Sequence, residues 1–296
     1  MKKRKWLLPG VLAAIVVVLL ILLFAVASMR LPLSYGQRDT MPMSEDEEGY
    51  DAYVEALNLS TIAAGNIEKY FGGELPDYYG GMSVVESEGE YLLRVYLTED
   101  TQEHRDEICE AAGMVIRAYT TSDVSWNRLQ KVVDKVDAIR SLPFVEVQGI
   151  GIRVDDRCVR AYLSHKDSLT MAMLGFADFR GLLELVIAPV KPGTSYSGIT
   201  DDHTVTMTVS GLDHVTGYEI QLSTDPFFME GPEEELEEGE VAVEDQLLSI
   251  ENDSSVSEIT FTGLEGADQW YVRGRSWLDV EGEHYESGWS SIKAVK

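Results

Sequence analysis

Cysteine and histidine are scarce in this chain of 296 residues, and their scarcity limits the chemistry that the chain can carry. It has two cysteines, Cys109 and Cys158, and five histidines. Two cysteines are too few for a disulfide-stapled scaffold, and no cysteine precedes Cys109 to carry a lipid anchor. No histidine lies in HExxH, HxH or another metal-ligand spacing. We therefore expect no metal site and no cofactor.

Motifs for nucleophilic catalysis and phosphate binding are missing as well. No serine lies in a GxSxG segment, and no GDSGG-like segment is present. Asp201 and Asp202 could orient His203, but no recognisable nucleophile accompanies them. Gly149 and Gly151 form a lone glycine pair in a strand-like pattern, which indicates a bulge or a close backbone approach rather than a phosphate loop. The sequence therefore predicts a protein without enzymatic activity.

Basic residues are few relative to acidic ones. Lysine and arginine number 24 against 51 aspartates and glutamates, so the formal net charge is −27. The electrostatic field of a chain this acidic repels nucleic acid, so we expect no nucleic-acid partner. No Asp-x-Asp-x-Asp-Gly loop indicates a calcium site, so the simplest role of the acidic surface is solubility.

One long hydrophobic run is present. Residues 6–29 read WLLPGVLAAIVVVLLILLFAVASM and follow the basic tail 1–5. The run is uncharged and exceeds the roughly 20 residues that cross a bilayer, and the basic tail favours a cytoplasmic N-terminus. We expect a transmembrane signal anchor, a stalk over 30–45, and extracytoplasmic C-terminal domains on a single-pass cell-membrane protein. A signal peptide cleaved after Ala27 remains the alternative.

Two similar segments follow, and each predicts a helix, a hairpin, a second helix and a strand. In the first, these elements cover 50–71, 81–98, 99–113 and 114–120. In the second, they cover 124–142, 145–164, 168–179 and 182–188.

The hairpins of the two segments align in sequence. LLRVYLT (92–98) matches CVRAYLS (158–164), which pairs Arg94 with Arg160, Tyr96 with Tyr162 and Leu97 with Leu163. We predict duplicated α+β lobes over 46–122 and 123–188, each a three-stranded sheet with helices on one face. Cys109 would lie on a helix of the first lobe and Cys158 on a strand of the second, so we expect no bond between them.

The order of hairpin, short helix and returning strand, with the turn in VDDRCVRAYLS, resembles the prodomains of α-lytic protease and streptogrisin. The resemblance covers 65–188 and rests on this pattern rather than on a motif. It implies duplicated lobes that assist the folding of a serine protease and inhibit it. No protease follows in this chain, which departs from those proteins.

From Thr204 onward the sequence alternates as an all-β sandwich does. The expected strands are 204–212, 217–225, 257–264, 269–280 and 285–295.

Several motifs in this region are similar to the fibronectin type III modules of bacterial surface proteins. They are GYEIQLSTD, Leu264 with Trp270 six residues later, a hairpin at Glu281-Gly282, and YESGWS. The resemblance covers 204–296 and implies an immunoglobulin-like sandwich, for which we expect a domain over 189–296. Trp270 replaces the usual corner tyrosine, and an acidic insertion over 229–246 is expected to be a disordered loop.

In the strand expected over 269–280, successive side chains point to opposite faces of the sheet. Trp270 would point into the core, whereas Arg273, Arg275 and Trp277 would share the opposite face with Trp289 of a neighbouring strand. Trp289 could then stack between the two guanidinium groups. The sequence leaves open whether this face is a ladder that stiffens the sheet or a patch that binds carbohydrate or peptide.

Taken together, these features predict a non-enzymatic binding or scaffold protein, membrane-anchored at the bacterial cell surface. Its partner would be an unknown extracellular protein or glycan. The alternative, implied by the prodomain resemblance, is a regulator or inhibitor of a separately encoded secreted protease.

Overall fold

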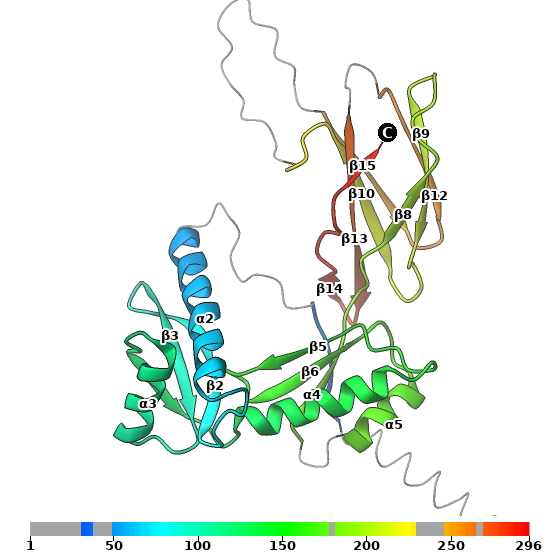
Figure 1. The fold of residues 1–296 in the computed structure, drawn as a ribbon. Helices are drawn as coiled ribbons and strands as arrows, with labels where there is room; N and C mark the ends of the chain where they lie inside the picture. The colour runs from blue at the N-terminus through cyan, green and yellow to red at the C-terminus, as the bar shows by residue number, and fades with distance from the viewer. Residues whose placement is uncertain (1–30, 38–48, 178–180, 229–245, 265–268, 296) are drawn as a thin grey trace, which may run out of the picture. The chain divides into compact units, whose positions relative to one another are not determined.

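A computed structural model describes residues 31–37, 49–177, 181–228, 246–264 and 269–295. The described residues fall into two compact units, divided near Ser34 and again after Val186. The first unit holds both predicted lobes, and the second holds the predicted sandwich (Figure 1).

Lobe 1 (46–122) is a three-stranded sheet covered by two helices. Its elements, in chain order, are α2 (Tyr50–Tyr70), β2 (Tyr79–Ser87), β3 (Glu90–Leu97), α3 (Gln102–Ala112) and β4 (Ala118–Thr121). The sheet order is β2-β3-β4, with β3 antiparallel to β2 and parallel to β4.

Both helices of lobe 1 pack on the same face of the sheet. Val95 and Leu97 share that face of β3 and are fully buried against Ile67 of α2 and Ile108 of α3. Gly113 ends α3 in the left-handed conformation, as a C-capping glycine does.

Lobe 2 (123–188) repeats this order of elements. It contains α4 (Trp126–Arg140), β5 (Gly149–Arg153), β6 (Cys158–Leu163), α5 (Ser168–Ala177) and β7 (Leu183–Ile187). Its sheet has the order β1-β7-β6-β5.

The edge strand β1 (Leu33–Tyr35) lies where the sequence predicted a polar stalk. It pairs with β7, and Leu31 just before it is 7% exposed and belongs to the core of lobe 2. Part of the predicted stalk is therefore a fourth strand of the lobe 2 sheet. A strand of three residues is too short to show a period-2 pattern, which explains why the sequence did not reveal it.

The duplication extends to the register of single residues. Tyr96 and Tyr162, which the alignment pairs, are each 6% exposed on the central strand of their sheet. Arg94 and Arg160, also aligned, lie opposite Ser83 and Gly151 of the preceding hairpin strand. The aligned tyrosines therefore have the same burial in the two lobes.

The two lobes meet at a pair of glycines in β2. The Gly81 backbone has a φ of 113°, and a Cβ there would lie 2.9 Å from both methyl groups of Val154 and 3.1 Å from the Trp126 ring. A Cβ on Gly80 would lie 3.1 Å from the Val124 carbonyl oxygen. Because glycine has no side chain, three residues of lobe 2 come into contact with the backbone of lobe 1.

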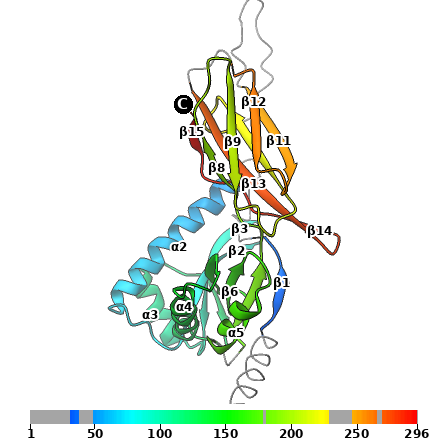
Figure 2. The same cartoon turned by 90° about the vertical axis from the view of Figure 1, so that its right-hand side faces the viewer.

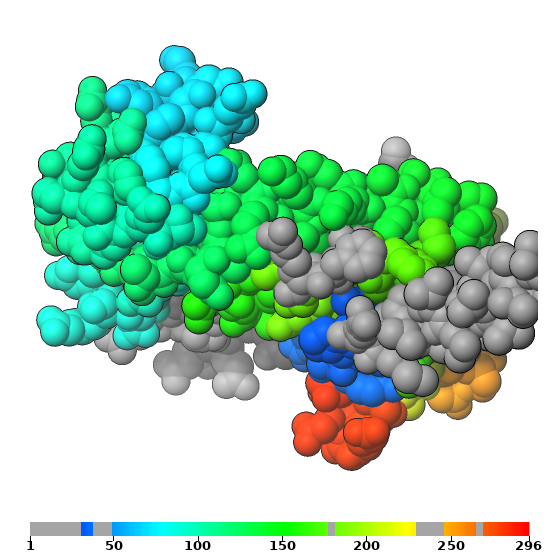
Figure 3. Space-filling view, turned by 90° about the horizontal axis from the view of Figure 1, so that it is seen from below, coloured from blue at the N-terminus to red at the C-terminus, as the bar shows by residue number. Residues whose placement is uncertain are grey.

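Polar contacts reinforce this junction. Asp155, in the hairpin turn of lobe 2, accepts hydrogen bonds from the hydroxyls of Tyr96 and of Ser83, the latter at 2.7 Å. Asn127 of α4 donates to the Leu75 carbonyl oxygen at 2.7 Å. In the space-filling view the two lobes lie directly side by side (Figure 3).

The second unit is a sandwich of two antiparallel sheets (Figure 2). The smaller has the order β12-β9-β8, from Glu258–Thr262, Thr204–Ser210 and Gly193–Tyr196. The larger has the order β11-β10-β13-β14, with β15 also on β13, from Leu247–Asp253, Gly217–Ser223, Trp270–Val280, Glu283–Glu286 and Lys293–Val295. Buried side chains from both sheets form one core around Trp270. The acidic insertion predicted over 229–246 lies outside the described residues except for Gln246.

The predicted transmembrane helix is not supported, which corrects the predicted fold class. Among the residues that the structure describes, no helix is long and apolar enough to cross a membrane. The longest of them, α2, has 21 residues but carries charges such as Asp51, Glu55 and Glu68. The predicted segment 6–29 itself lies outside the described residues. The predicted membrane partner and single-pass location depended on that helix, so they are not supported either.

The cysteine prediction is confirmed. Cys109 lies on α3 of lobe 1, Cys158 begins β6 of lobe 2, and both are free thiols. Burial raises the pKa of the Cys158 thiol to about 12, so that thiol stays protonated at neutral pH.

The glycine junction predicts that Gly81→Ala destabilises the first unit. The new Cβ would clash with lobe 2 at a backbone angle unfavourable to alanine, so the free energy of unfolding should fall by more than about 1 kcal/mol. Gly65→Ala on α2 is the matched control, because its Cβ would meet nothing within 4 Å and should stabilise the helix by up to about 1 kcal/mol. Urea unfolding measures both, and equal stability of Gly81→Ala and the wild type would contradict the junction.

Candidate functional site

The predicted arginine and tryptophan face lies on β13 as the alternation indicated. Trp270 is fully buried, whereas Arg273, Arg275 and Trp277 are partly exposed on the opposite face. Trp289 follows β14 and is also partly exposed. The period-2 assignment is therefore confirmed.

Three of the four predicted residues form one stack. The Trp289 ring lies between two guanidinium groups, 4.1 Å from that of Arg273 and 4.7 Å from that of Arg275. Phe228 extends the stack, with its ring 4.2 Å from the Arg273 guanidinium. The sequence predicted the Trp289 stacking but not Phe228, which follows β10 and carries no pattern that points to this face.

Trp277, the fourth predicted residue, lies apart from the stack. Its ring centroid is 6.0 Å from that of His284, and it covers Gly217, where a Cβ would lie 2.4 Å from the indole. A hydrogen bond to Asp279 raises the pKa of His284, and Glu286 adds to this effect. The predicted residues thus do not form one continuous patch.

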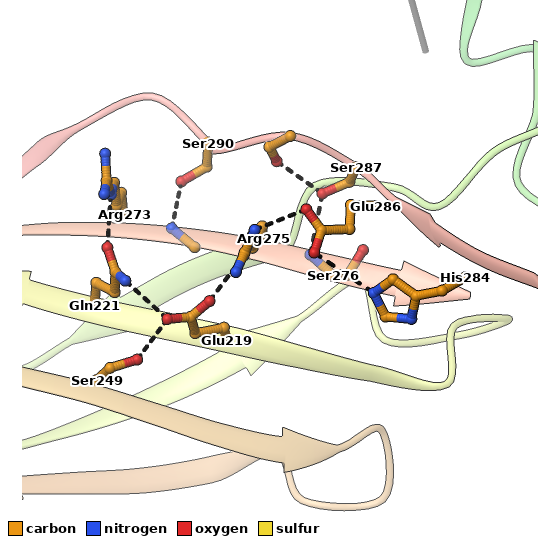
Figure 4. Close-up of polar contacts among 12 residues, drawn as sticks. Glu219, Gln221, Ser249, Arg273, Arg275, Ser276, His284, Glu286, Ser287 and Ser290 are labelled. Atoms are coloured by element: carbon orange, nitrogen blue, oxygen red, sulfur yellow. Dashed lines mark hydrogen bonds and ion pairs between the residues drawn. The ribbon is translucent and has the colours of Figure 1, made fainter. Parts of the chain in front are cut away.

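The arginine side chains of the stack are engaged by neighbouring polar groups (Figure 4). Arg275 donates to Glu219 at 2.8 Å and to Glu286 at 2.7 Å. Arg273 donates to the Gln221 side chain at 2.9 Å, and Gln221 in turn donates to Glu219 at 2.8 Å. Donors that bond within the sheet are not free for a ligand, so these contacts favour a stiffening ladder over a binding patch.

Serine side chains hold the segment that carries Trp289 against β13. The hydroxyl of Ser287 accepts from the Ser276 amide, and that of Ser290 accepts from the Gly274 amide, both at 3.0 Å. The backbone amides of Ser287 and Ser290 donate back to the same two residues of β13, at 2.9 and 2.7 Å. The hydrogen bonds of the YESGWS segment to β13 therefore hold Trp289 over the two arginines.

Glu219 is the buried anion of this network and is 4% exposed. Burial alone would raise its pKa, but hydrogen bonds from Ser249, Arg275 and Gln221 outweigh burial and hold the pKa below its ordinary value. The carboxylate therefore stays charged inside the sheet face at neutral pH.

Sequence reasoning missed a second candidate site, a cavity of about 350 Å³ in the first unit. It is lined by α2, the loop that follows α2, the start of β2 and the first turns of α4. It therefore lies where lobe 1 meets lobe 2, and we call it the lobe groove. Its volume falls within the range of small-ligand and side-chain pockets.

The walls of the lobe groove combine apolar and polar side chains. Its apolar side chains include Ile67, Leu75 and Met82, and α4 contributes Trp126 and Gln130. On the α2 wall lie Ser60, Ala64 and Glu68. These residues are too far apart in sequence to form a motif, so no local signal could have indicated the groove.

Histidines elsewhere show no catalytic geometry within the described residues. His165 Nδ1 lies 3.0 Å from Ser164 Oγ and 3.8 Å from a Glu146 carboxylate oxygen, so the same nitrogen faces both groups. A catalytic triad uses a different ring nitrogen for each. His203 and His214 are exposed turn residues. Among the described residues no three His, Cys, Asp or Glu side chains form a metal-binding group.

Comparison with known proteins adds no relative. No protein-family model matches the chain, and no curated protein matches it. The resemblances to fibronectin type III modules and to protease prodomains therefore remain predictions from the residues that carry them.

The buried and stacked tryptophans should differ in their contribution to stability. Trp270→Ala removes a fully buried ring and should cost about 3–5 kcal/mol of unfolding free energy. Trp289→Ala removes a partly exposed ring with two cation–π contacts of about 0.5–1 kcal/mol each, so its cost should be clearly smaller. Chemical denaturation measures both, and equal losses would show that Trp289 also belongs to the core.

The lowered pKa of Glu219 predicts that the sandwich loses stability at acidic pH. Because the folded-state pKa is below the unfolded value of 4.5, the carboxylate stabilises the fold above that pH. The stabilisation is lost as the pH falls through the folded-state pKa. Glu219→Gln should therefore lose less stability than the wild type between about pH 6 and pH 3. Unfolding curves at several pH values measure this difference, exposed Glu258→Gln controls for the change in net charge, and parallel profiles would contradict it.

Proposed function

We propose that this chain is a non-enzymatic binding protein that holds its ligand in the lobe groove. The observation that carries the proposal is the cavity of about 350 Å³ at the junction of the two lobes, which both apolar and polar side chains line. Pockets that bind side chains or small molecules combine a mostly apolar surface with a few polar groups that orient the ligand.

The lobe groove is a better ligand site than the arginine and tryptophan stack. In the stack, Arg275 already bonds to two carboxylates, and Arg273 bonds to Gln221 between two aromatic rings. In the groove, Glu68 is exposed and lacks an ion pair within the described residues. An unengaged charge on the wall of a cavity can bind a ligand without first breaking an internal contact.

The groove lining supports binding rather than catalysis. Among the described residues that line it, Glu68 is the one carboxylate, and none is a histidine, cysteine or lysine. General acid–base and nucleophilic catalysis need at least two cooperating groups within hydrogen-bond distance. Tyr79 is the other titratable residue of the lining, and burial raises its pKa far above neutrality, so it is a poor base.

A second function, regulation or inhibition of a separately encoded secreted protease, is favoured by the repeated order of elements in the two lobes. It predicts that the purified chain lowers the activity of a serine protease from the same organism at stoichiometric ratio. Unchanged activity of the secreted proteases tested would count against it.

Filling the groove tests the binding proposal. Ala64 and Ala52 are both exposed on α2, but only Ala64 lines the groove. Wild type, Ala64→Phe and Ala52→Phe are applied to one printed array of oligosaccharides and linear peptides. We expect the wild type and Ala52→Phe to retain the same ligands and Ala64→Phe to lose them. Equal binding by both variants, no retained ligand, or turnover of a retained ligand would overturn the proposal.

A further inference from the structure

The lining of the lobe groove separates apolar surface from a single charge. Leu75 and Met82 are partly exposed apolar residues of the lining, and Trp126 adds a partly exposed aromatic ring. Glu68 is the one charged residue among the described residues that line it. Lys69, the next residue, does not line the groove. An occupant that matches this lining has an aliphatic stem and a positively charged end.

The two helices at the groove bring ends of opposite partial charge to it. Glu68 lies in the last turn of α2, where the helix macrodipole is negative, whereas Trp126 opens α4, where it is positive. A cation is therefore favoured at the α2 wall and disfavoured at the α4 wall. The charged end of the occupant should lie beside Glu68, with its stem against the apolar side chains of the lining.

We infer, on the basis of the proposed function, that the groove binds an arginine side chain of a partner polypeptide. The guanidinium would pair with the Glu68 carboxylate, and the three methylenes would pack on Leu75 and Met82. Arginine suits this site better than lysine because its planar guanidinium is less strongly hydrated and can donate two parallel hydrogen bonds to one carboxylate.

The charge of the whole chain favours the same partner. Acidic residues outnumber basic ones 51 to 24, so a basic polypeptide is attracted over a distance and an acidic one is repelled. This long-range attraction is sensitive to salt, whereas the burial of the aliphatic stem is not. Binding should therefore weaken with salt without being abolished.

The experiment uses the full chain and a fluorescent peptide with a single arginine between leucines, capped at both ends. A second peptide carries citrulline, which has the same shape without the charge. We expect the wild type to bind the arginine peptide and to lose about fivefold in affinity for the citrulline peptide, the upper range for an exposed ion pair. Glu68→Gln should lose a similar factor for the arginine peptide. Glu55→Gln, an exposed acid of α2 outside the groove, should lose none.

The outcomes separate this inference from the proposed function. If Ala64→Phe abolishes binding of the arginine peptide but Glu68→Gln and the citrulline peptide bind as tightly as their counterparts, the groove is a binding site and the arginine inference is wrong. If the array ligands enter the groove and the arginine peptide does not bind, the inference is likewise wrong. If Ala64→Phe leaves all binding unchanged, the groove is not the site and both proposals fall.

Discussion

The close approach of lobe 2 to the backbone at Gly80 and Gly81 is the constraint on which the first unit depends. No other residue type leaves room for Trp126 and Val154 against this strand, and the positive φ of Gly81 adds a second requirement for glycine. Once the lobes are joined there, α4 begins beside β2 and α2, and the lobe groove follows. The candidate site is thus a consequence of how two duplicated halves pack.

The second unit depends on a different interaction, in which a buried carboxylate is bonded to polar side chains on one face of the larger sheet. Glu219 is nearly inaccessible, and it is kept ionised by hydrogen bonds from Arg275, Gln221 and Ser249. The arginines are in turn held by stacking on Trp289. These side chains are engaged with one another within the unit, which is why the face that the sequence left open as a possible binding patch is better explained as a structural element.

Duplication explains both what the lobes share and where they differ. The central strands keep a buried tyrosine and, two residues before it, a partly exposed arginine. The period-2 alternation places these two side chains on the same face of the sheet in each copy. The copies diverge at their edges. β2 has the glycine bulge that receives lobe 2, whereas in lobe 2 the extra strand β1 extends the sheet beyond β7.

The sequence by itself determined the order of elements from α2 to β7, the hairpin turn at Glu281 and the two faces of β13, because turn chemistry and period-2 alternation are local properties of the chain. It did not reveal the sandwich strands β8 and β11. Only the tertiary structure decided that Glu68 and Trp126 share a cavity and that Glu219 anchors the arginines. Such contacts depend on how elements distant in sequence pack together, which the local pattern of residues does not predict. The strand at 33–35 was missed because it is too short to carry a pattern, and its place is set by the free edge of β7.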